Sequence, residues 1–455
     1  MDPGLGESVV CRASARRALG AALALVRSAG LQPSHHEDKT MTSLPPGVLP
    51  APHPAQGWTA PGFEYVARVF ASQLASGEEV GAGFTVYHRG TCVVDLWGGQ
   101  ADVASQRPWG SDTRLVLFSV TKALAAMALH LLAEDALLVW DAPVADYWPG
   151  FAAAGKGRIT VRTLVNHRGG LAALDAPVRL RDCLEPGRSQ RVLRALERQA
   201  PAWEPEQGQG YHALTFGLYV DELFRRIAGE DMGAFLRRRL LEPLRSDVWL
   251  GTPPAYDLLF ATLYPPPTLW RLRQMVRAMS VDPDSTEARV ARDLPKKGSL
   301  TRRAFSRPSA GAGGLAEYNA LPVRRSCFPS ASATGSAHGL ARAFLPFALG
   351  GEVEGKRYFS EASLEPLMRR QGWSERDSVL QKPLGWSQGF LKEERHLFCP
   401  NPSSFGHSGM GGALGWCDPS QGVALGYVMN RMDWRVRSPR CVALCRALYE
   451  CEPLR

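Results

Sequence analysis

The run "LVLFSVTKALAAMALHLLAEDALL", residues 115–138, constrains the fold more than any other part of the 455-residue chain. It is almost wholly apolar over a length that predicts a helix buried in a protein core. Ser119 and Lys122 nevertheless lie near its start. A buried lysine is costly unless it is paired or neutral. Lys122 therefore either reaches water on the open side of the helix or lies where a lowered pKa is useful.

The spacing of Ser119 and Lys122 suggests a reactive pair. Residues three apart share a face of a helix, so the two side chains point the same way. A serine hydroxyl becomes a good nucleophile when a base takes its proton, and a lysine desolvated by apolar neighbours can be that base. The Ser-x-x-Lys spacing occurs once in the chain. Taken alone, it fits more simply a helix-start serine followed by a lysine that extends to the surface.

Strand patterns at both ends of the chain, with helical patterns between them, predict the fold class. The pattern of residues 63–80 predicts a helix, and that of 81–99 predicts a hairpin turned at Arg89 and Gly90. Three strands and a helix are predicted near the C-terminus, over residues 384–391, 412–417, 422–430 and 438–450. We therefore expect an α+β fold: one antiparallel sheet built from both chain ends and flanked by helices, with an inserted, mostly helical domain.

These patterns also divide the chain into an extension and a body. We expect residues 1–60 to be an N-terminal extension, either a targeting sequence or a disordered tail, and residues 61–450 to be the folded domain. Within that domain, the sheet part is expected over 61–115 and 384–450, and the helical part over 116–383. A flexible, charged excursion is expected within the helical part, at residues 281–314.

Composition argues against several classes of protein. The net charge of +9 comes from scattered basic residues without interleaved aromatic side chains, so we expect no nucleic-acid partner. No run of 18 apolar residues exists, so no transmembrane segment is expected. Nine cysteines at irregular spacing favour reduced thiols in an intracellular protein. The arginine-bearing N-terminal segment leaves a mitochondrial and a cytoplasmic location both open. No His-x-His-x-Asp cluster is present, so neither a zinc-dependent hydrolase nor any metal or cofactor is expected.

Five segments in order carry a resemblance to a known family. After "SVTK" come "ITVRTLVNHRGGLAALD", "WEPEQGQGYHALTFGLYVDELFRRIAG", "SASATGSAHGLARAF" and "FGHSGMGGALGWCDPSQGVALGYVMN". Together they resemble the serine β-lactamases and penicillin-binding proteins over residues 62–448. The resemblance is greatest to the esterase-like branch with class C character, which includes the animal β-lactamase-domain proteins. It implies the serine β-lactamase/DD-peptidase-like fold.

The resemblance also implies roles for named residues. Ser119 would be the nucleophile that forms an acyl-enzyme, and Lys122 would assist its deprotonation. Tyr211 matches the tyrosine of the family's Tyr-x-Asn motif, where a phenol beside an ammonium can act as a general base.

A second group of implied roles concerns substrate binding. His407, Ser408 and Gly409 occupy the position of the family's Lys-Thr-Gly triad. The backbone N–H groups of Met410 and Ser119 would form the oxyanion hole. Histidine is mostly neutral at pH 7, which favours neutral esters or amides over anionic β-lactams.

Two further positions depart from the family's pattern. Ala213 stands where many relatives have asparagine, and Glu206 stands where the turn usually has glycine. His212 could partly replace the missing amide but is expected to be structural, and His167 is expected to brace a loop.

Two functions therefore stay open. One is a serine hydrolase that acts through an acyl-enzyme on a small ester, lactone or amide. The other is a catalytically weak relative that serves as an interaction or assembly protein. The oligomeric state is open in both cases.

Overall fold

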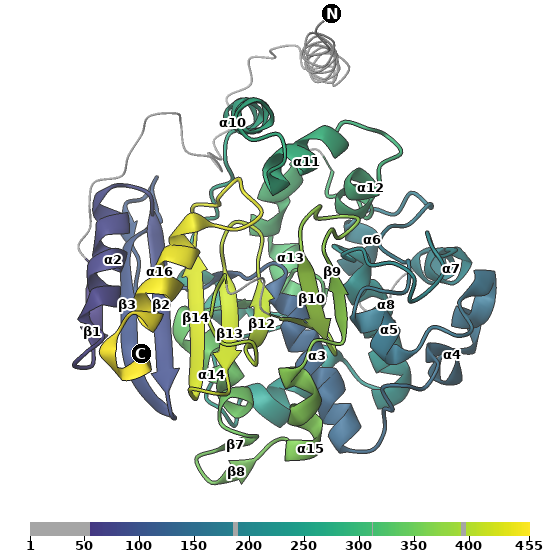
Figure 1. Cartoon of the computed structure of the whole chain (residues 1–455), viewed down its shortest axis with the longest axis horizontal. Coiled ribbons are helices and arrows are strands. Elements are labelled where there is room, and N and C mark those ends of the chain that lie inside the picture. The colour runs from purple at the N-terminus through teal and green to yellow at the C-terminus, as the bar shows by residue number, and fades with distance from the viewer. Residues whose placement is uncertain (1–54, 185–189, 312, 393–396) are drawn as a thin grey trace, which may run out of the picture.

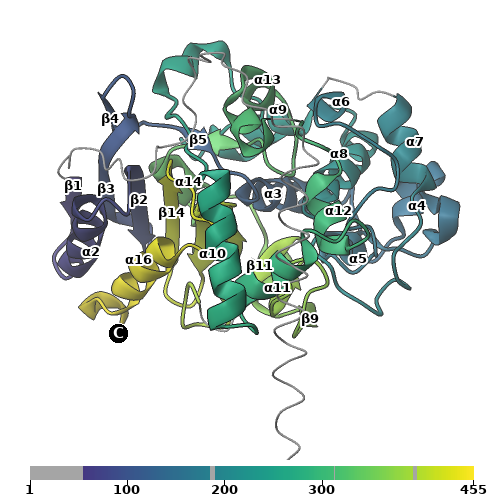
Figure 2. The same cartoon turned by 90° about the horizontal axis from the view of Figure 1, so that it is seen from above.

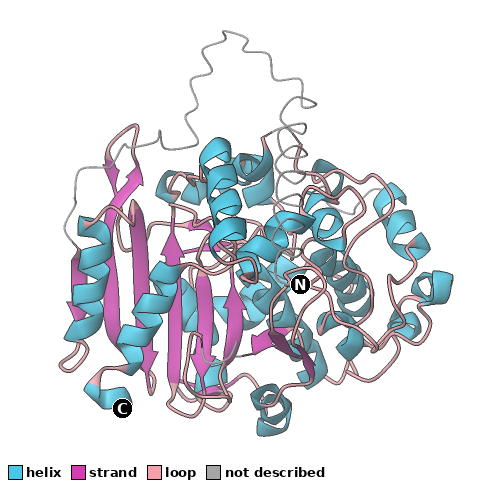
Figure 3. Cartoon of the chain, turned by 45° about the horizontal axis from the view of Figure 1, so that its top comes forward, coloured by secondary structure: helices cyan, strands magenta, loops and turns pink. Residues whose placement is uncertain are grey.

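The computed structural model describes residues 55–184, 190–311, 313–392 and 397–455. The expected N-terminal extension lies outside these residues except for its last six, which include the first strand, β1 (Gln56–Thr59). Strands gather on one side of the molecule and helices on the other (Figure 1), as the predicted α+β class requires. Figure 3 shows the same division by secondary structure.

A single antiparallel sheet is built from both ends of the chain. Its order is β1, β3 (Thr91–Asp102), β2 (Gly81–His88), β14 (Val423–Met429), β13 (Leu414–Asp418), β12 (Phe405–Ser408), β11 (Phe390–Lys392), β10 (Leu384–Ser387) and β9 (Gly372–Ser374), with β4 (Arg107–Pro108) paired to β3. The predicted hairpin is the pair β2 and β3, and its turn contains Arg89 and Gly90 as expected. Strand β2 pairs with β14 from Val423 opposite His88 to Met429 opposite Ala82. This pairing joins the two chain ends.

Alternate side chains of β14 enter two different cores. Val423, Leu425, Tyr427 and Met429 pack with α2 (Glu64–Ala75) and α16 (Pro439–Tyr449). Ala424 and Val428 join the core that contains α14 (Ala337–Ala348). The period of two in a strand places successive side chains on opposite faces, so helices cover both faces of the sheet. Figure 2, in which the molecule is seen from above, shows α2 and α16 on one face of the sheet and α14 on the other.

Helix α3 (Val120–Glu134) lies between the sheet and the helical body. It contacts β11 and β12 on one side, and α8 (Thr215–Ala228) and α9 (Met232–Leu236) on the other.

The remaining short helices are α4 (Val144–Tyr147), α5 (Val161–Val165), α6 (Arg181–Leu184), α7 (Gln190–Arg198), α13 (Leu321–Arg325) and α15 (Glu361–Leu364). Two-residue strands form the pairs β5 (Leu115–Val116) with β6 (Thr334–Gly335) and β7 (Glu352–Val353) with β8 (Lys356–Arg357).

The stretch 281–314 differs from the flexible excursion that we expected. It follows α10 (Thr268–Val281) and contains α11 (Thr286–Asp293) and α12 (Leu300–Ser306). The hydroxyls of Ser285 and Ser299 cap these two helices by accepting backbone N–H groups. The serine hydroxyls accept hydrogen bonds from backbone N–H groups that otherwise lack partners at a helix start. The charged composition of this stretch did not indicate these two helices. Strand β9 also differs, because it joins the sheet from within the part assigned to helices.

None of the helices in the described part of the chain has the length and apolarity needed to cross a membrane.

Helix α14 lies directly on the sheet because glycines occupy the contact. A Cβ atom at Gly426 would lie 2.2 Å from the carbonyl oxygen of Ala337, and one at Gly415 would lie 2.4 Å from the ring of Phe344. Real side chains do not approach backbone atoms this closely. The position of α14 therefore depends on residues without side chains.

We expect Gly426→Ala to lower the free energy of unfolding by about 1–3 kcal/mol, because its methyl group would force the helix away from the sheet. Urea denaturation would measure the change. Gly298→Ala is the matched control, since nothing lies within 4 Å of a Cβ built there. Equal stability of the two variants would contradict this account of the helix–sheet contact.

Candidate active site

Ser119 lies at the surface end of a buried segment. It immediately precedes α3 and is the one residue from Thr113 to Leu132 that is not buried. The preceding residue, Phe118, has a left-handed backbone with φ of 47°, which is unusual for a residue with a large side chain. Ser119 follows this turn and is half-buried at the N-terminus of the helix.

Lys122 is fully buried one turn along the same helix. Its Nζ lies 3.3 Å from Ser119 Oγ and donates to the carbonyl oxygens of Ala213, at 2.8 Å, and Ser330, at 2.9 Å. No carboxylate of the described residues forms an ion pair with it. Burial lowers the pKa of Lys122 well below its usual range. The first of the two alternatives left by the sequence, a lysine that reaches water, is therefore wrong.

Tyr211 lies beside this lysine. Its ring centroid is 5.0 Å from Lys122 Nζ, and its ring stacks on Trp386 with a centroid distance of 5.7 Å. Its backbone N–H donates to a carboxylate oxygen of Asp377, at 3.1 Å. Although burial raises the pKa of Asp377 to about 6, hydrogen bonds from backbone N–H groups oppose this shift. Asp377 and Trp386 thus fix the backbone and the ring of Tyr211.

Three buried histidines lie around Lys122 and Tyr211. His167 Nδ1 accepts the backbone N–H of His212, at 3.1 Å, so His167 braces this segment as expected. His212 is fully buried, and burial together with the charge of Lys122 lowers its pKa to about 3. The same two causes lower the pKa of His407 well below its usual range. All three imidazoles are therefore neutral near pH 7.

The end of β12 supplies the other predicted residues. The ring of His407 lies 6.1 Å from that of Tyr211, and its Nδ1 bonds the carbonyl oxygen of Ser408 at 2.7 Å. A Cβ atom at Gly409 would lie 2.4 Å from the carbonyl oxygen of Leu117, so the chain after β12 lies against the segment that precedes Ser119. Met410 is half-buried. Within the described part of the chain, the backbone N–H groups of Met410 and Ser119 have no hydrogen-bond acceptor.

Ala213 and Glu206, which depart from the family's pattern, are both accommodated in the structure. At Ala213 it is the backbone carbonyl, and not a side chain, that contacts Lys122. Glu206 keeps the left-handed backbone of a glycine, with φ of 70°. Its carboxylate accepts from Arg168 Nε at 2.6 Å and also from the hydroxyl of Thr163. Neither departure displaces Tyr211 from Lys122.

Ser330, Asp377 and Trp386 belong to this site but were not singled out from the sequence. Ser330 contributes a carbonyl oxygen, which carries no side-chain signal. Asp377 lies 166 residues from Tyr211 in the chain. In the sequence, Ser330 begins the segment "SASATGSAHGL", which resembles a turn of the family. That resemblance assigns Ser330 no role.

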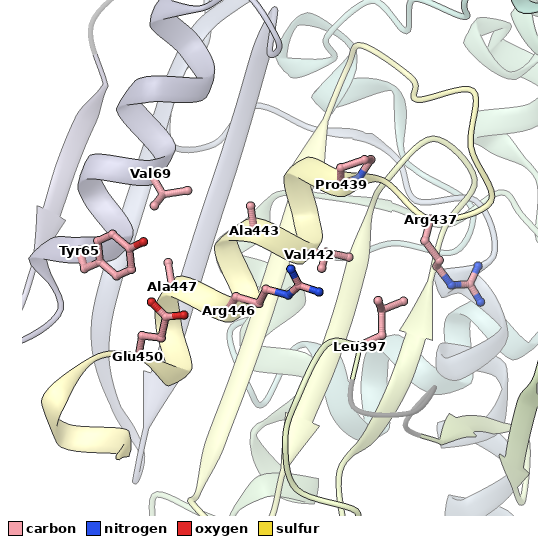
Figure 4. Close-up of a pocket in the computed structure, with 10 residues that line it drawn as sticks. All are labelled: Tyr65, Val69, Leu397, Arg437, Pro439, Val442, Ala443, Arg446, Ala447 and Glu450. Atoms are coloured by element: carbon pink, nitrogen blue, oxygen red, sulfur yellow. The ribbon is translucent and has the colours of Figure 1, made fainter. Parts of the chain in front are cut away.

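No group of three histidine, cysteine, aspartate or glutamate side chains that could hold a metal ion was found in the residues that the structure describes. A groove of about 460 Å³ lies elsewhere, on the outer surface along α2 and α16 (Figure 4). Its lining includes Tyr65, Val69, Arg437 and Arg446, none of which was predicted for the site.

The chain is similar to known proteins over most of its length. The family model described as Beta-lactamase matches residues 66–443. The esterase/beta-lactamase LipL of Mycobacterium tuberculosis is 34% identical over 380 residues, which cover 83% of each chain. The crystal structure of a family VIII carboxylesterase is similar with a TM-score of 0.75 and 33% identity, covering 87% of this chain and 99% of that one. A penicillin-binding protein homologue from Caulobacter crescentus has a TM-score of 0.74 and 32% identity over 87% of this chain and 99% of its own.

The buried amine gives a pH-dependent prediction that needs no substrate. In the unfolded chain Lys122 titrates near pH 10.4, whereas its folded pKa is much lower, so the unfolded state binds one more proton between these values. Stability of the wild type relative to Lys122→Met should therefore rise with pH, by up to about 1.4 kcal/mol per pH unit.

Urea denaturation at pH 7, 8 and 9 would measure this slope. Lys297→Met, at an exposed lysine, is the control and should leave the pH dependence of the wild type unchanged. A constant stability difference between the wild type and Lys122→Met from pH 7 to 9 would mean that Lys122 is charged in the folded protein.

Proposed function

This chain belongs to the beta-lactamase family, in the branch of the family VIII carboxylesterases, and from this membership we propose that it is a serine hydrolase that cleaves small uncharged esters through an acyl-enzyme. The observation that carries the proposal is the buried Lys122, which has no carboxylate partner among the described residues and lies 3.3 Å from the hydroxyl of the half-buried Ser119. A neutral amine at this distance can take the proton of the nucleophile.

The hydrogen bonds of Lys122 orient its lone pair. A neutral amine has two N–H bonds, and two carbonyl oxygens, those of Ala213 and Ser330, accept from Nζ. The lone pair is then left for the third neighbour, the Ser119 hydroxyl. As Ser119 Oγ forms a bond to the ester carbonyl carbon, its proton passes to Nζ. The resulting ammonium returns that proton to the leaving alcohol when the ester C–O bond breaks.

Tyr211 is proposed to share this proton transfer. Its ring lies against Lys122 Nζ, so charge on either group affects the other. Water then attacks the acyl-enzyme and gives one proton to this lysine–tyrosine pair. The pair returns a proton to Ser119 Oγ as the carboxylic acid leaves. The catalytic groups are thereby restored without a metal or a cofactor.

The oxyanion that forms during acylation needs hydrogen-bond donors. The N–H groups of Ser119 and Met410 have no acceptor among the described residues, and both residues are half-buried. Gly409 lets the chain that carries Met410 approach Leu117, two residues before Ser119. We assign these two N–H groups to the oxyanion hole, where preorganised donors stabilise developing charge.

Neutral surroundings favour an uncharged substrate. His407 replaces the family's lysine, and burial lowers its pKa well below its usual range, so its imidazole is neutral. It therefore offers no positive charge to a substrate carboxylate. Short-chain esters, lactones and amides without a carboxylate fit this site best. Two relatives, a family VIII carboxylesterase and the esterase/beta-lactamase LipL, are esterases, which supports an ester substrate.

We expect Ser119→Ala to abolish both labelling by a fluorophosphonate probe and hydrolysis of p-nitrophenyl acetate, because it removes the nucleophile. Ser105→Ala is the control, since Ser105 is an exposed serine remote from α3 in the sequence. Circular dichroism would confirm that both variants fold. Labelling that persists in Ser119→Ala, or a folded wild type that neither labels nor hydrolyses any short-chain ester, would favour the alternative of an interaction protein.

Gly409→Ala tests the proposed oxyanion hole. Its methyl group would lie 2.4 Å from the carbonyl oxygen of Leu117 and would push Met410 away from Ser119. Loss of one oxyanion donor typically lowers kcat by about 100-fold or more, so we expect a fall of that order with little change in KM. Gly298→Ala should retain wild-type kcat. A Gly409→Ala variant with wild-type kcat would remove Met410 from the mechanism.

A further inference from the structure

Helix α10 packs against α11 and is exposed on one side. None of its fourteen residues, Thr268–Val281, is buried. Its apolar side chains belong to none of the hydrophobic clusters formed by the described residues. Figure 2 shows the helix on the outside of the molecule. One side of the helix lacks a partner in the described structure, and its exposed residues are Leu269, Trp270, Arg273, Arg277, Ser280 and Val281.

The exposed side chains of α10 are of two kinds. Leu269 is 66% exposed, Trp270 is 39% exposed and Val281 is 74% exposed, which is unusual for apolar side chains of this size. Four more apolar side chains are only half-buried, namely Leu272, Met275, Val276 and Met279. These four lie on the opposite side of the helix, so the apolar side chains of α10 that face water are Leu269, Trp270 and Val281.

The charge of α10 has one sign. The helix carries Arg271, Arg273 and Arg277 and no acidic residue. None of these arginines forms an ion pair within the described part of the chain. The acidic residues Asp282 and Asp284 follow only after the helix has ended. The exposed apolar side chains thus share their side of the helix with Arg273 and Arg277, whereas Arg271 is half-buried.

We infer that α10 is a docking surface for an anionic lipid bilayer. A helix with tryptophan and leucine beside arginines, and without acidic residues, matches the composition that binds at the interface of such a bilayer. A second copy fits poorly, because its arginines would meet these arginines. The N-terminal extension also fits poorly, because residues 1–30 carry four arginines and two acidic residues.

Backbone hydrogen bonds connect α10 to the candidate active site. Tyr264, four residues before the helix, accepts the N–H of Met432 and donates to the carbonyl oxygen of Asn430. Met432 lies so close to Gly411 that a Cβ there would contact it at 2.8 Å. Gly411 follows Met410 directly. These contacts fix the segment that leads into α10 to the chain that carries the proposed oxyanion donor, whereas lipid binding by α10 does not rest on the proposed function.

The test is sedimentation of the full chain with vesicles. We expect binding to phosphatidylcholine vesicles that contain phosphatidylglycerol, weaker binding at high salt, and little binding to phosphatidylcholine alone. Arg273→Gln with Arg277→Gln should lower the partition coefficient about thirtyfold, because each arginine near an anionic surface contributes a factor of about five. Leu269→Ser with Trp270→Ser should lower it at least tenfold.

Matched controls distinguish the contribution of α10 to vesicle binding from that of the protein's overall charge. Arg194→Gln with Arg198→Gln removes the same charge from exposed positions of α7, and Trp58→Ser removes an exposed tryptophan from β1. Both should bind like the wild type. The inference fails if the controls and the α10 variants lose binding equally, or if the wild type binds no vesicle. It also fails if the wild type is a dimer that the Leu269 and Trp270 variant dissociates, which would assign the face to a second copy. Fluorophosphonate labelling of each variant reports on Ser119 separately.

Discussion

The burial of Lys122, with no counter-charge among the described residues, is the constraint on which this structure depends most. Three segments distant in sequence meet at its side-chain nitrogen: α3, the chain at Ala213 and the chain at Ser330. A charged ammonium in this place would oppose folding, since two carbonyl oxygens replace its hydration only in part. The neutral amine is therefore favoured by the fold itself. It is also the form required by the base proposed for Ser119, so the same desolvation would serve the proposed chemistry.

The same neutrality extends to the groups around the lysine. His167, His212 and His407 have lowered pKa values because they are buried and because Lys122 lies near them. The carboxylate of Asp377 serves a different purpose, since it accepts backbone N–H groups and holds the segment of Tyr211. Stacked rings and backbone contacts thus position the side chains here, while fixed charge contributes little. Such a site suits a substrate that brings no charge of its own.

Small residues decide how closely the elements approach one another. Gly409 lets the chain after β12 lie against Leu117, and Gly426 lets α14 lie against the sheet. The first contact sets the distance between Met410 and Ser119, and the second fixes a helix that covers the sheet face. Because β2 pairs with β14, both contacts belong to one continuous sheet made from the two ends of the chain. The sheet is therefore a rigid support for one side of the site.

The sequence alone determined the helix that follows Ser119 and the strands at both chain ends. The apolar period and the three-residue spacing placed Ser119 and Lys122 on one face of α3, and strand patterns at both ends predicted the sheet, because these signals are local. Only the tertiary structure decided that Lys122 is buried, that Ala213 and Ser330 hold it, and that Asp377 and Trp386 fix Tyr211. It also replaced the expected excursion at 281–314 with two capped helices. These contacts join segments far apart in the chain, and several use backbone groups, which every residue has and no sequence pattern distinguishes.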